Sequence, residues 1–297
     1  MNASGSPVRR RPPIVKLALA GTTLMGLAGG AHAAEPEPFK VCAPPYTMPM
    51  SDRDGAGYEN RIAEMFAAQL GQKTSFTWFP QRMGFIRATL KNNETDDGNY
   101  KCDYVMGVVE NFELAATTRP YMRSTWALVY AKGRGLDWIK SQADLKNLSD
   151  EHKALLKIGI WDQGPTTEWV YKLGLIEQAT PYPMMSGDPK QSPAHIVEKE
   201  LVSGNVNLTF LWGPLAGYVA KKITDPDLVV IPLETDMGIK FDFQIAMAVR
   251  HGDDKRLTLL NGLIEKNQAD IDQLIAGYGV PLLELQVNQK PKEDDDD

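Results

Sequence analysis

Few residues of this 297-residue chain have the types and spacing that enzyme chemistry requires. Its two cysteines are Cys42 and Cys102, and the histidines beyond the leader, His152, His195 and His251, stand far from one another. Zinc sites need clustered ligands, and a nucleophile needs a nearby base, so neither is predicted. The sequence also lacks a G-x-S-x-G elbow and a phosphate-binding loop. We therefore predict a non-enzymatic protein with no metal and no cofactor.

The first 33 residues have the pattern of a secretory signal. Three arginines and Lys16 precede the apolar run 17–28, and Ala31-His32-Ala33 carries the small residues that a signal peptidase accepts. Cleavage after Ala33 and Sec export to the periplasm are expected, since Pro12-Pro13 departs from the twin-arginine pattern. A retained anchor is the alternative, but the run is shorter than the roughly 20 residues of a membrane span.

The mature chain is acidic. Residues 1–33 hold four basic and no acidic residues, so their removal leaves 28 basic against 38 acidic residues, a formal charge of −10. This charge repels phosphate backbones and argues against nucleic acid as a partner.

An even pair of cysteines in an exported chain predicts a disulfide. Cys42 and Cys102 lie in two expected strands, 40–43 and 102–108. If these strands are parallel neighbours about 4.8 Å apart, the two alpha carbons fall within disulfide range. Two buried free thiols are the alternative.

Strand and helix patterns alternate along the chain, which favours an α/β fold with parallel sheets. The expected strands are 40–43, 76–79, 102–108, 124–131, 157–161, 207–211, 228–232 and 241–249. The expected helices are 58–70, 84–90, 166–173, 194–203, 215–222 and a long region, 253–275, that is broken once.

Two long strands, 124–131 and 241–249, are expected to carry the chain between two lobes. This connectivity predicts hinge closure over a cleft. The predicted divisions are the signal peptide 1–33, lobe 1 at 34–126 and again at 244–290, lobe 2 at 127–243, and a disordered acidic tail at 291–297.

Several of these segments resemble the type II periplasmic solute-binding proteins. They are the helix motif at 57–71, the third strand at 102–107, the Pro-Tyr hinge entry at 119–121 and the second-lobe opening at 143–148. The resemblance implies two doubly wound lobes joined by a two-crossing hinge.

A narrower set of motifs is similar to the MxaJ/XoxJ family. P-Q-R-x-G-F-I-R at 80–87 and T-T-R-P-Y-x-R-S at 117–124 are its most specific members. The resemblance implies an accessory protein of pyrroloquinoline quinone (PQQ) methanol dehydrogenase in the periplasm of methylotrophs. Such a protein binds the dehydrogenase, or a segment of it, and assists its maturation or activity in methanol oxidation.

Departures from the amino-acid receptors of the superfamily favour this narrower resemblance. Those receptors hold a ligand carboxylate with an arginine soon after the third strand, where this chain has 110–113, Glu-Asn-Phe-Glu. They hold the ligand ammonium with an aspartate after the 207–211 strand, where this chain has Trp212. Arg119 comes too late to replace the arginine. The main alternative is an ABC-transporter receptor for a small non-amino-acid ligand, and a periplasmic enzyme is a third.

The candidate binding residues lie at strand ends and in loops that we expect to face the cleft. Thr166 and Thr167 begin a helix whose free amides and hydroxyls could hold an anion or a carbonyl, with simple capping as the alternative. Aromatic side chains could grip an apolar ligand or a partner, with packing between lobes as the alternative: Tyr46, Phe85, Trp161 and Trp212. Arg82 and Arg119 are the basic candidates, and structural salt bridges are the alternative for them.

Overall fold

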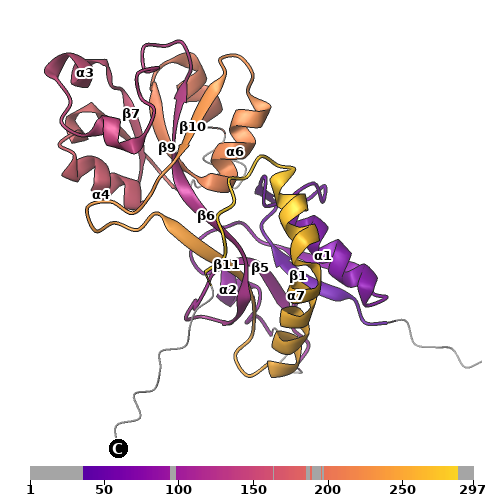
Figure 1. Cartoon of the computed structure of the whole chain (residues 1–297). Coiled ribbons are helices and arrows are strands. Elements are labelled where there is room, and N and C mark those ends of the chain that lie inside the picture. Colours follow the sequence, from indigo (N-terminus) through magenta and orange to yellow (C-terminus); the bar gives the residue numbers. More distant parts are fainter. Residues whose placement is uncertain are drawn as a thin grey trace, which may run out of the picture. The chain divides into compact units, whose positions relative to one another are not determined.

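One long strand, β6 (Ala116–Ala131), connects the two halves of the sheet (Figure 1). In the computed structural model, residues 36–93, 98–162, 164–184, 188, 195 and 197–286 are described. The predicted signal peptide and acidic tail lie outside these residues. Within them, every helix is too short or too polar to span a membrane.

The first half-sheet has the strand order β4 (Thr74–Trp78), β1 (Phe39–Ala43), β5 (Tyr104–Val109) and β11 (Asp242–Val249). β4, β1 and β5 are parallel, whereas β11 is antiparallel to both β5 and β6. The second half-sheet contains β9 (Leu208–Trp212), β7 (Ile158–Trp161) and β8 (Ala179–Tyr182), which are parallel to one another. β10 (Leu228–Pro232) pairs with the other edge of β6.

The partner of β6 changes in the middle of the strand. Thr125 is the last of its residues to pair with β11, and Trp126 is the first to pair with β9. The chain returns beside this point, because the Trp126 amide donates to the Phe241 carbonyl at 3.1 Å. Since the chain from Pro36 onward groups as one compact unit, its division into two lobes stays a prediction.

Helices cover these sheets. They are α1 (Tyr58–Gln69), α2 (Phe85–Ala88), α3 (Asp150–Leu155), α4 (Pro165–Lys172), α6 (Gly213–Lys222) and α7 (Asp254–Ala276). Short turns of other helix types are η1 (Gln142–Leu145), η2 (Ile176–Gln178) and η3 (Val197–Leu201), and β2 (Tyr46–Thr47) with β3 (Ser51–Asp52) forms a hairpin.

The two half-sheets have separate apolar cores. α1 buries Ile62 and Phe66, which are one helical turn apart, in a cluster shared with α7 and the first half-sheet. In the second half-sheet, the fully buried Trp169 of α4 packs edge-on against Phe210 and Phe241. Burial of these faces explains why the predicted periodicities appear as helices and strands.

Three expectations about elements were wrong. β6 begins at Ala116 rather than at 124, because residues 116–123 continue the ladder with β11. α7 is unbroken, since the polar Asn267 in its middle is buried and bonded to the Leu263 carbonyl and to Gln69. β8 was not expected, although its Pro181 suits an edge strand.

Candidate functional site

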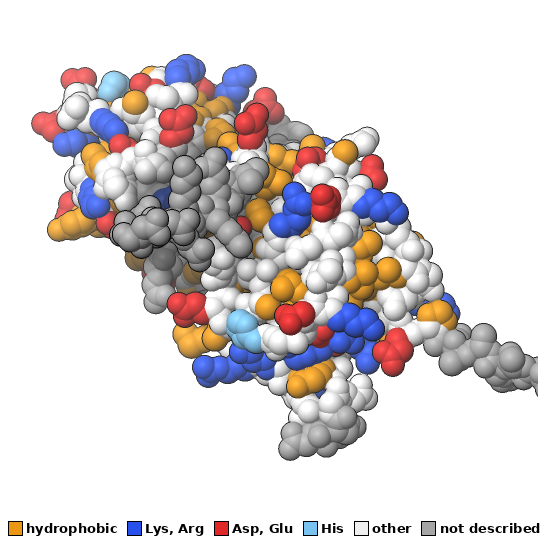
Figure 2. All heavy atoms as spheres, turned by 60° about the horizontal axis from the view of Figure 1, so that its bottom comes forward, with side chains coloured by type: hydrophobic (Ala, Val, Ile, Leu, Met, Phe, Trp, Pro, Cys, Tyr) orange, Lys and Arg blue, Asp and Glu red, His pale blue; other side chains and the backbone are white. Residues whose placement is uncertain are grey.

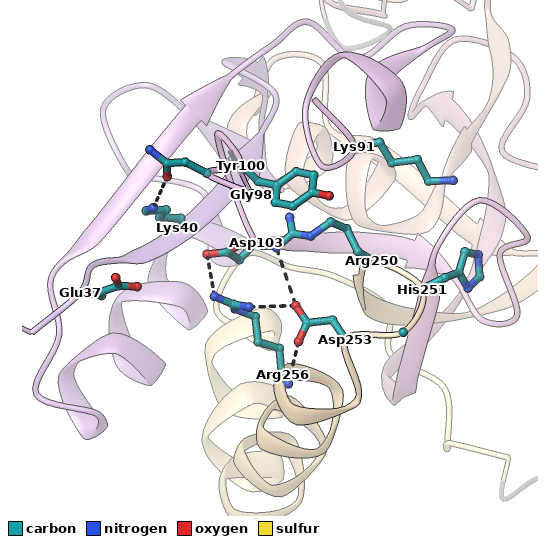
Figure 3. A pocket seen from close by; sticks show the side chains of 12 residues that line it. Glu37, Lys40, Lys91, Gly98, Tyr100, Asp103, Arg250, His251, Asp253 and Arg256 are labelled. Carbon is teal, nitrogen blue, oxygen red and sulfur yellow. Dashed lines mark hydrogen bonds and ion pairs between the residues drawn. The ribbon is translucent and has the colours of Figure 1, made fainter. Parts of the chain in front are cut away.

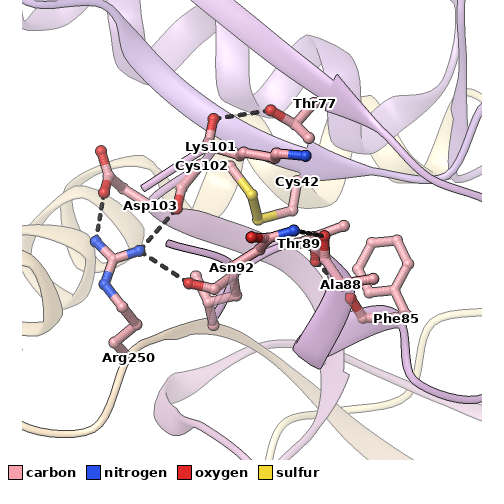
Figure 4. Close-up of a disulfide and its surroundings, with 11 residues drawn as sticks. Cys42, Thr77, Phe85, Ala88, Thr89, Asn92, Lys101, Cys102, Asp103 and Arg250 are labelled. Carbon is pink, nitrogen blue, oxygen red and sulfur yellow. Dashed lines mark hydrogen bonds and ion pairs between the residues drawn. A yellow bond between two sulfur atoms is a disulfide. The ribbon is translucent and has the colours of Figure 1, made fainter. Parts of the chain in front are cut away.

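The predicted disulfide between Cys42 and Cys102 is confirmed (Figure 4). Cys42 lies in β1, Cys102 precedes β5, and their alpha carbons are 5.4 Å apart. Both cysteines are buried in a cluster with Phe85 and Leu90, which come from α2 and the turn after it. The bond therefore joins β1 to the start of β5, and the α2 segment packs against it.

A hollow of about 700 Å³ lies at the N-terminal ends of β1 and β5, beside the start of α7 (Figure 3). Lys40 of β1, Asp103 before β5 and Arg250 after β11 line it. Because β1 and β5 are parallel, this hollow is at the end of the first half-sheet opposite to Ala43 and the β2–β3 hairpin.

The arginines of this hollow are occupied by protein groups. Arg250 Nη1 donates to the carbonyls of Leu90 and Cys102 at 3.1 and 2.7 Å, and Nη2 bonds to Asp103 Oδ1. The Tyr100 ring lies 3.9 Å from the same guanidinium. Arg256 then bridges Asp103 and Asp253 at 3.5 and 2.9 Å. Two arginines thus balance two aspartates. We interpret these four residues, called the Arg250 seam below, as a structural salt-bridge network rather than an anion site.

Glu59, in the first turn of α1, is a buried carboxyl group without a cationic partner among the described residues. Its Oε1 accepts a hydrogen bond of 3.3 Å from the Tyr121 hydroxyl of β6. The carboxyl also fills the space that a side chain at Gly107 would need, which explains the glycine there. Burial raises the pKa of Glu59 to about 7, although the Tyr121 hydrogen bond lowers it.

In the second half-sheet, three predicted residues lie together at the start of α4. Thr167 Oγ1 donates to the Trp161 carbonyl at 2.7 Å. The Thr166 hydroxyl is buried and has no hydrogen-bond partner among the described residues. Trp161 itself is buried and donates its indole N–H to the Phe210 carbonyl, so packing accounts for its position.

The other predicted aromatic residues have different surroundings. Trp212 ends β9 and packs edge-on against Phe243, with ring centroids 6.0 Å apart. Tyr46 is half-buried in the β2–β3 hairpin opposite Asp52. Phe85 is buried against Phe79, whose ring also lies 4.9 Å from the guanidinium of the exposed Arg82.

Arg119 lies away from these groups. Its guanidinium is 3.4 Å from Glu265 of α7, and its backbone N–H donates to Asn261 of the same helix. The structure therefore links Trp161 with Thr166 and Thr167, and Arg82 with Phe85. It records no contact that joins these two groups to each other, to Tyr46 or to Arg119 among the described residues. Their roles in binding remain predictions.

Sequence reasoning did not identify Glu59 or the Arg250 seam. The Tyr-Glu pair at 58–59 was visible within the α1 motif, but only the fold reveals that the carboxyl is buried. The seam joins residues about 147 positions apart in the chain, such as Asp103 and Arg250, so no local pattern indicates it. No cluster of His, Cys, Asp or Glu suited to a metal occurs in the described part of the chain.

Comparisons with known proteins give a consistent result. No family model matches the chain. It is similar to the crystal structure of the periplasmic binding protein XoxJ from Methylobacterium extorquens AM1, with 30% identity, 83% of this chain and 100% of that chain covered, and a TM-score of 0.65. It is also similar to MxaJ from Methlophaga aminisulfidivorans MPT, with 25% identity, coverage of 82% and 100%, and a TM-score of 0.64.

A curated relative agrees with these structures. Protein MoxJ of Methylorubrum extorquens is 28% identical over 270 residues, which cover 85% of each chain. The predicted fold class is confirmed, since the solved neighbours are periplasmic binding proteins and this chain has the same mixed α/β architecture around a central sheet.

Proposed function

We propose a function for this chain, which belongs to the XoxJ/MxaJ family of periplasmic binding proteins. It is a non-enzymatic periplasmic accessory protein of PQQ methanol dehydrogenase. It binds the dehydrogenase or a segment of it and assists the maturation or activity of that enzyme. The residues at 34–126 and 244–290 form one lobe and those at 127–243 the other, with β6 and β11 as the two crossings.

One observation supports this proposal over a receptor for free amino acids. The position where such receptors place an aspartate holds Trp212, whose ring packs against Phe243. The position where they place an arginine holds Glu110, which accepts a hydrogen bond of 2.8 Å from Gln244. Neither charged end of an amino acid finds its usual partner there.

The first basic side chain after this position in the sequence is Arg119, and it is directed to α7. Its pairing with Glu265 at 3.4 Å places it outside that role. A chain that has the binding-protein fold but lacks this arginine and this aspartate is better suited to bind a protein partner than a free amino acid.

The proposal is tested by capture from the periplasm. The mature protein, tagged at its C-terminus, is used at low salt to capture partners from a methanol-grown source strain. Dehydrogenase in the eluate and reduced dehydrogenase activity in a deletion strain are expected. Absence of the enzyme from the eluate, together with unaltered dehydrogenase in the deletion strain, contradicts the proposal.

A second candidate function, a receptor for a small non-amino-acid solute, is favoured by the start of α4. There the Thr166 hydroxyl, which has no hydrogen-bond partner among the described residues, lies in the first turn of a helix. This function predicts a saturable thermal shift with one solute, which the variant Thr166→Val reduces. A shift of this kind without capture of the dehydrogenase favours the receptor.

A further inference from the structure

The loop between β4 and α2, residues 81–84, projects an apolar side chain into solvent. Met83 is 90% exposed, the highest value among the large hydrophobic side chains described. Gln81 and Arg82 precede it, Gly84 follows it, and all three are exposed. Isolated exposed methionines are common, so the surroundings of Met83 decide whether this one has a function.

The loop is held in one conformation. The Phe85 N–H donates to the Arg82 carbonyl at 3.0 Å, which closes the turn, and Gly84 adopts φ 86°, a conformation that favours glycine. The Arg82 guanidinium stacks on Phe79, whose ring packs edge-on against Phe85. These contacts fix the loop from both sides of Met83.

The base of the loop is fixed to the core. Phe85 and Ile86, which directly follow the loop, are buried in the same cluster as Cys42 and Cys102 (Figure 4). Thr89 Oγ1 also donates to the Phe85 carbonyl at 2.7 Å. The backbone of the loop therefore loses little conformational entropy when a partner binds, and the cost is confined to the side chains.

Two basic side chains flank Met83 on this acidic protein. Arg82 and Arg87 are both exposed, and neither forms an ion pair with any described residue. Lys91, also exposed, lies beyond the end of α2 and lines the hollow in Figure 3. Basic side chains gather beside hydrophobic ones along the lower border of the face shown in Figure 2.

We propose that residues 81–87, here called the Met83 knob, are a docking element for a protein partner whose surface offers an apolar pocket bordered by carboxylates. Methionine and arginine are enriched at protein interfaces, and a central apolar anchor with charged neighbours is the arrangement of a binding hot spot. Met83 enters the pocket, while Arg82 and Arg87 pair with its acidic border and speed association. This inference rests on the proposed function, in which the partner is the dehydrogenase.

Purified dehydrogenase is titrated against the mature protein, and the Kd is measured for the unaltered chain and two variants. Met83→Asp is expected to weaken binding by about tenfold or more, and Met83→Leu to retain most of it. The matched control Leu155→Asp, at a 48% exposed leucine that ends α3, is expected to bind as the unaltered chain does.

The charge contribution is tested with a charge-reversal pair. Arg82→Glu/Arg87→Glu is expected to lower the association rate and to flatten its dependence on salt concentration. Lys255→Glu/Lys266→Glu on α7 changes the net charge equally at two other exposed positions and is expected to have a smaller effect.

The outcomes separate this inference from the proposed function. If the unaltered chain does not bind the dehydrogenase, the proposed function fails. If it binds, and folded Met83→Asp binds equally well, the proposed function stands and the Met83 knob is refuted. The knob is refuted as well if Met83→Asp alters only self-association of the chain, measured by sedimentation.

Discussion

The two half-sheets are stabilised by different means. The first is cross-linked by the Cys42–Cys102 disulfide and by the buried pair Asp103–Arg250. The second depends on the aromatic cluster around Trp169, and no described residue there forms a disulfide. A cross-linked support holds surface loops in fixed positions, whereas an apolar core mainly stabilises the interior. The loop that presents Met83 belongs to the cross-linked half.

A carboxyl group in each half has a shifted pKa, and the two shifts have opposite directions. Glu59 is buried without a cation, and burial raises its pKa to about 7. Asp236 bonds to Lys146 Nζ at 2.8 Å, which lowers the pKa of Asp236, with a further contribution from the Trp169 indole. The first half therefore contains an unfavourable buried charge above neutral pH, and the second a favourable ion pair.

The largest expected effect is loss of the disulfide. Cys42→Ala/Cys102→Ala opens a loop with a sequence separation of 60 residues. The chain-entropy model predicts a loss of about 4 kcal/mol in the free energy of unfolding. Urea unfolding measures this change, and the unaltered protein in reductant is expected to match the double variant. A loss much below 1 kcal/mol contradicts the view that the first half depends on this cross-link.

The next effect is the pH dependence caused by Glu59. Its pKa is about 7 in the folded protein and 4.5 as the reference value for the unfolded chain. Because the folded pKa is the higher one, the stabilisation is complete below pH 4.5 and is lost as the pH rises through 7. At about 1.4 kcal/mol per pKa unit, the loss amounts to about 3 kcal/mol.

Glu59→Gln tests this directly, since the amide oxygen can still accept the Tyr121 hydrogen bond. The variant is expected to equal the unaltered protein near pH 4.5 and to be more stable than it at pH 8. Asp236 is the opposite case: the stability it contributes is present above its unfolded pKa and is lost as the pH falls, and Asp236→Asn removes this dependence. Urea unfolding across pH 4 to 8 measures the Glu59 difference, and measurements below pH 3.8 test the Asp236 difference. Equal slopes for Glu59→Gln and the unaltered protein would refute the role of Glu59.

The smallest expected effect is in the second half-sheet. Trp169→Phe keeps an aromatic ring near Phe210 and Phe241 but loses the 2.9 Å hydrogen bond to Asp236 and part of the buried volume. A loss of about 1 to 2 kcal/mol is expected. Thermal unfolding monitored by near-UV circular dichroism measures it. A loss greater than that of the disulfide variant reverses the proposed order of the two halves.

Local patterns predicted most of the elements. The 3.6-residue spacing from Ile62 to Phe66 predicted α1, and the paired cysteines predicted the disulfide. The same local patterns do not indicate which distant segments interact. The predicted break in α7 was wrong, and the contact that holds the polar Asn267 inside the helix comes from Gln69, 198 residues away. Glu59 and Gly107 likewise meet only in the folded chain. The candidate site was predicted as single residues, and the sequence could not indicate which of them lie together.

The most direct test of the central claim is a binding titration of the mature protein with purified PQQ methanol dehydrogenase at low ionic strength. Saturable binding that weakens as salt is added is the predicted result, together with no thermal shift by any free amino acid. No binding to the dehydrogenase, together with a saturable thermal shift by a single amino acid, would contradict it.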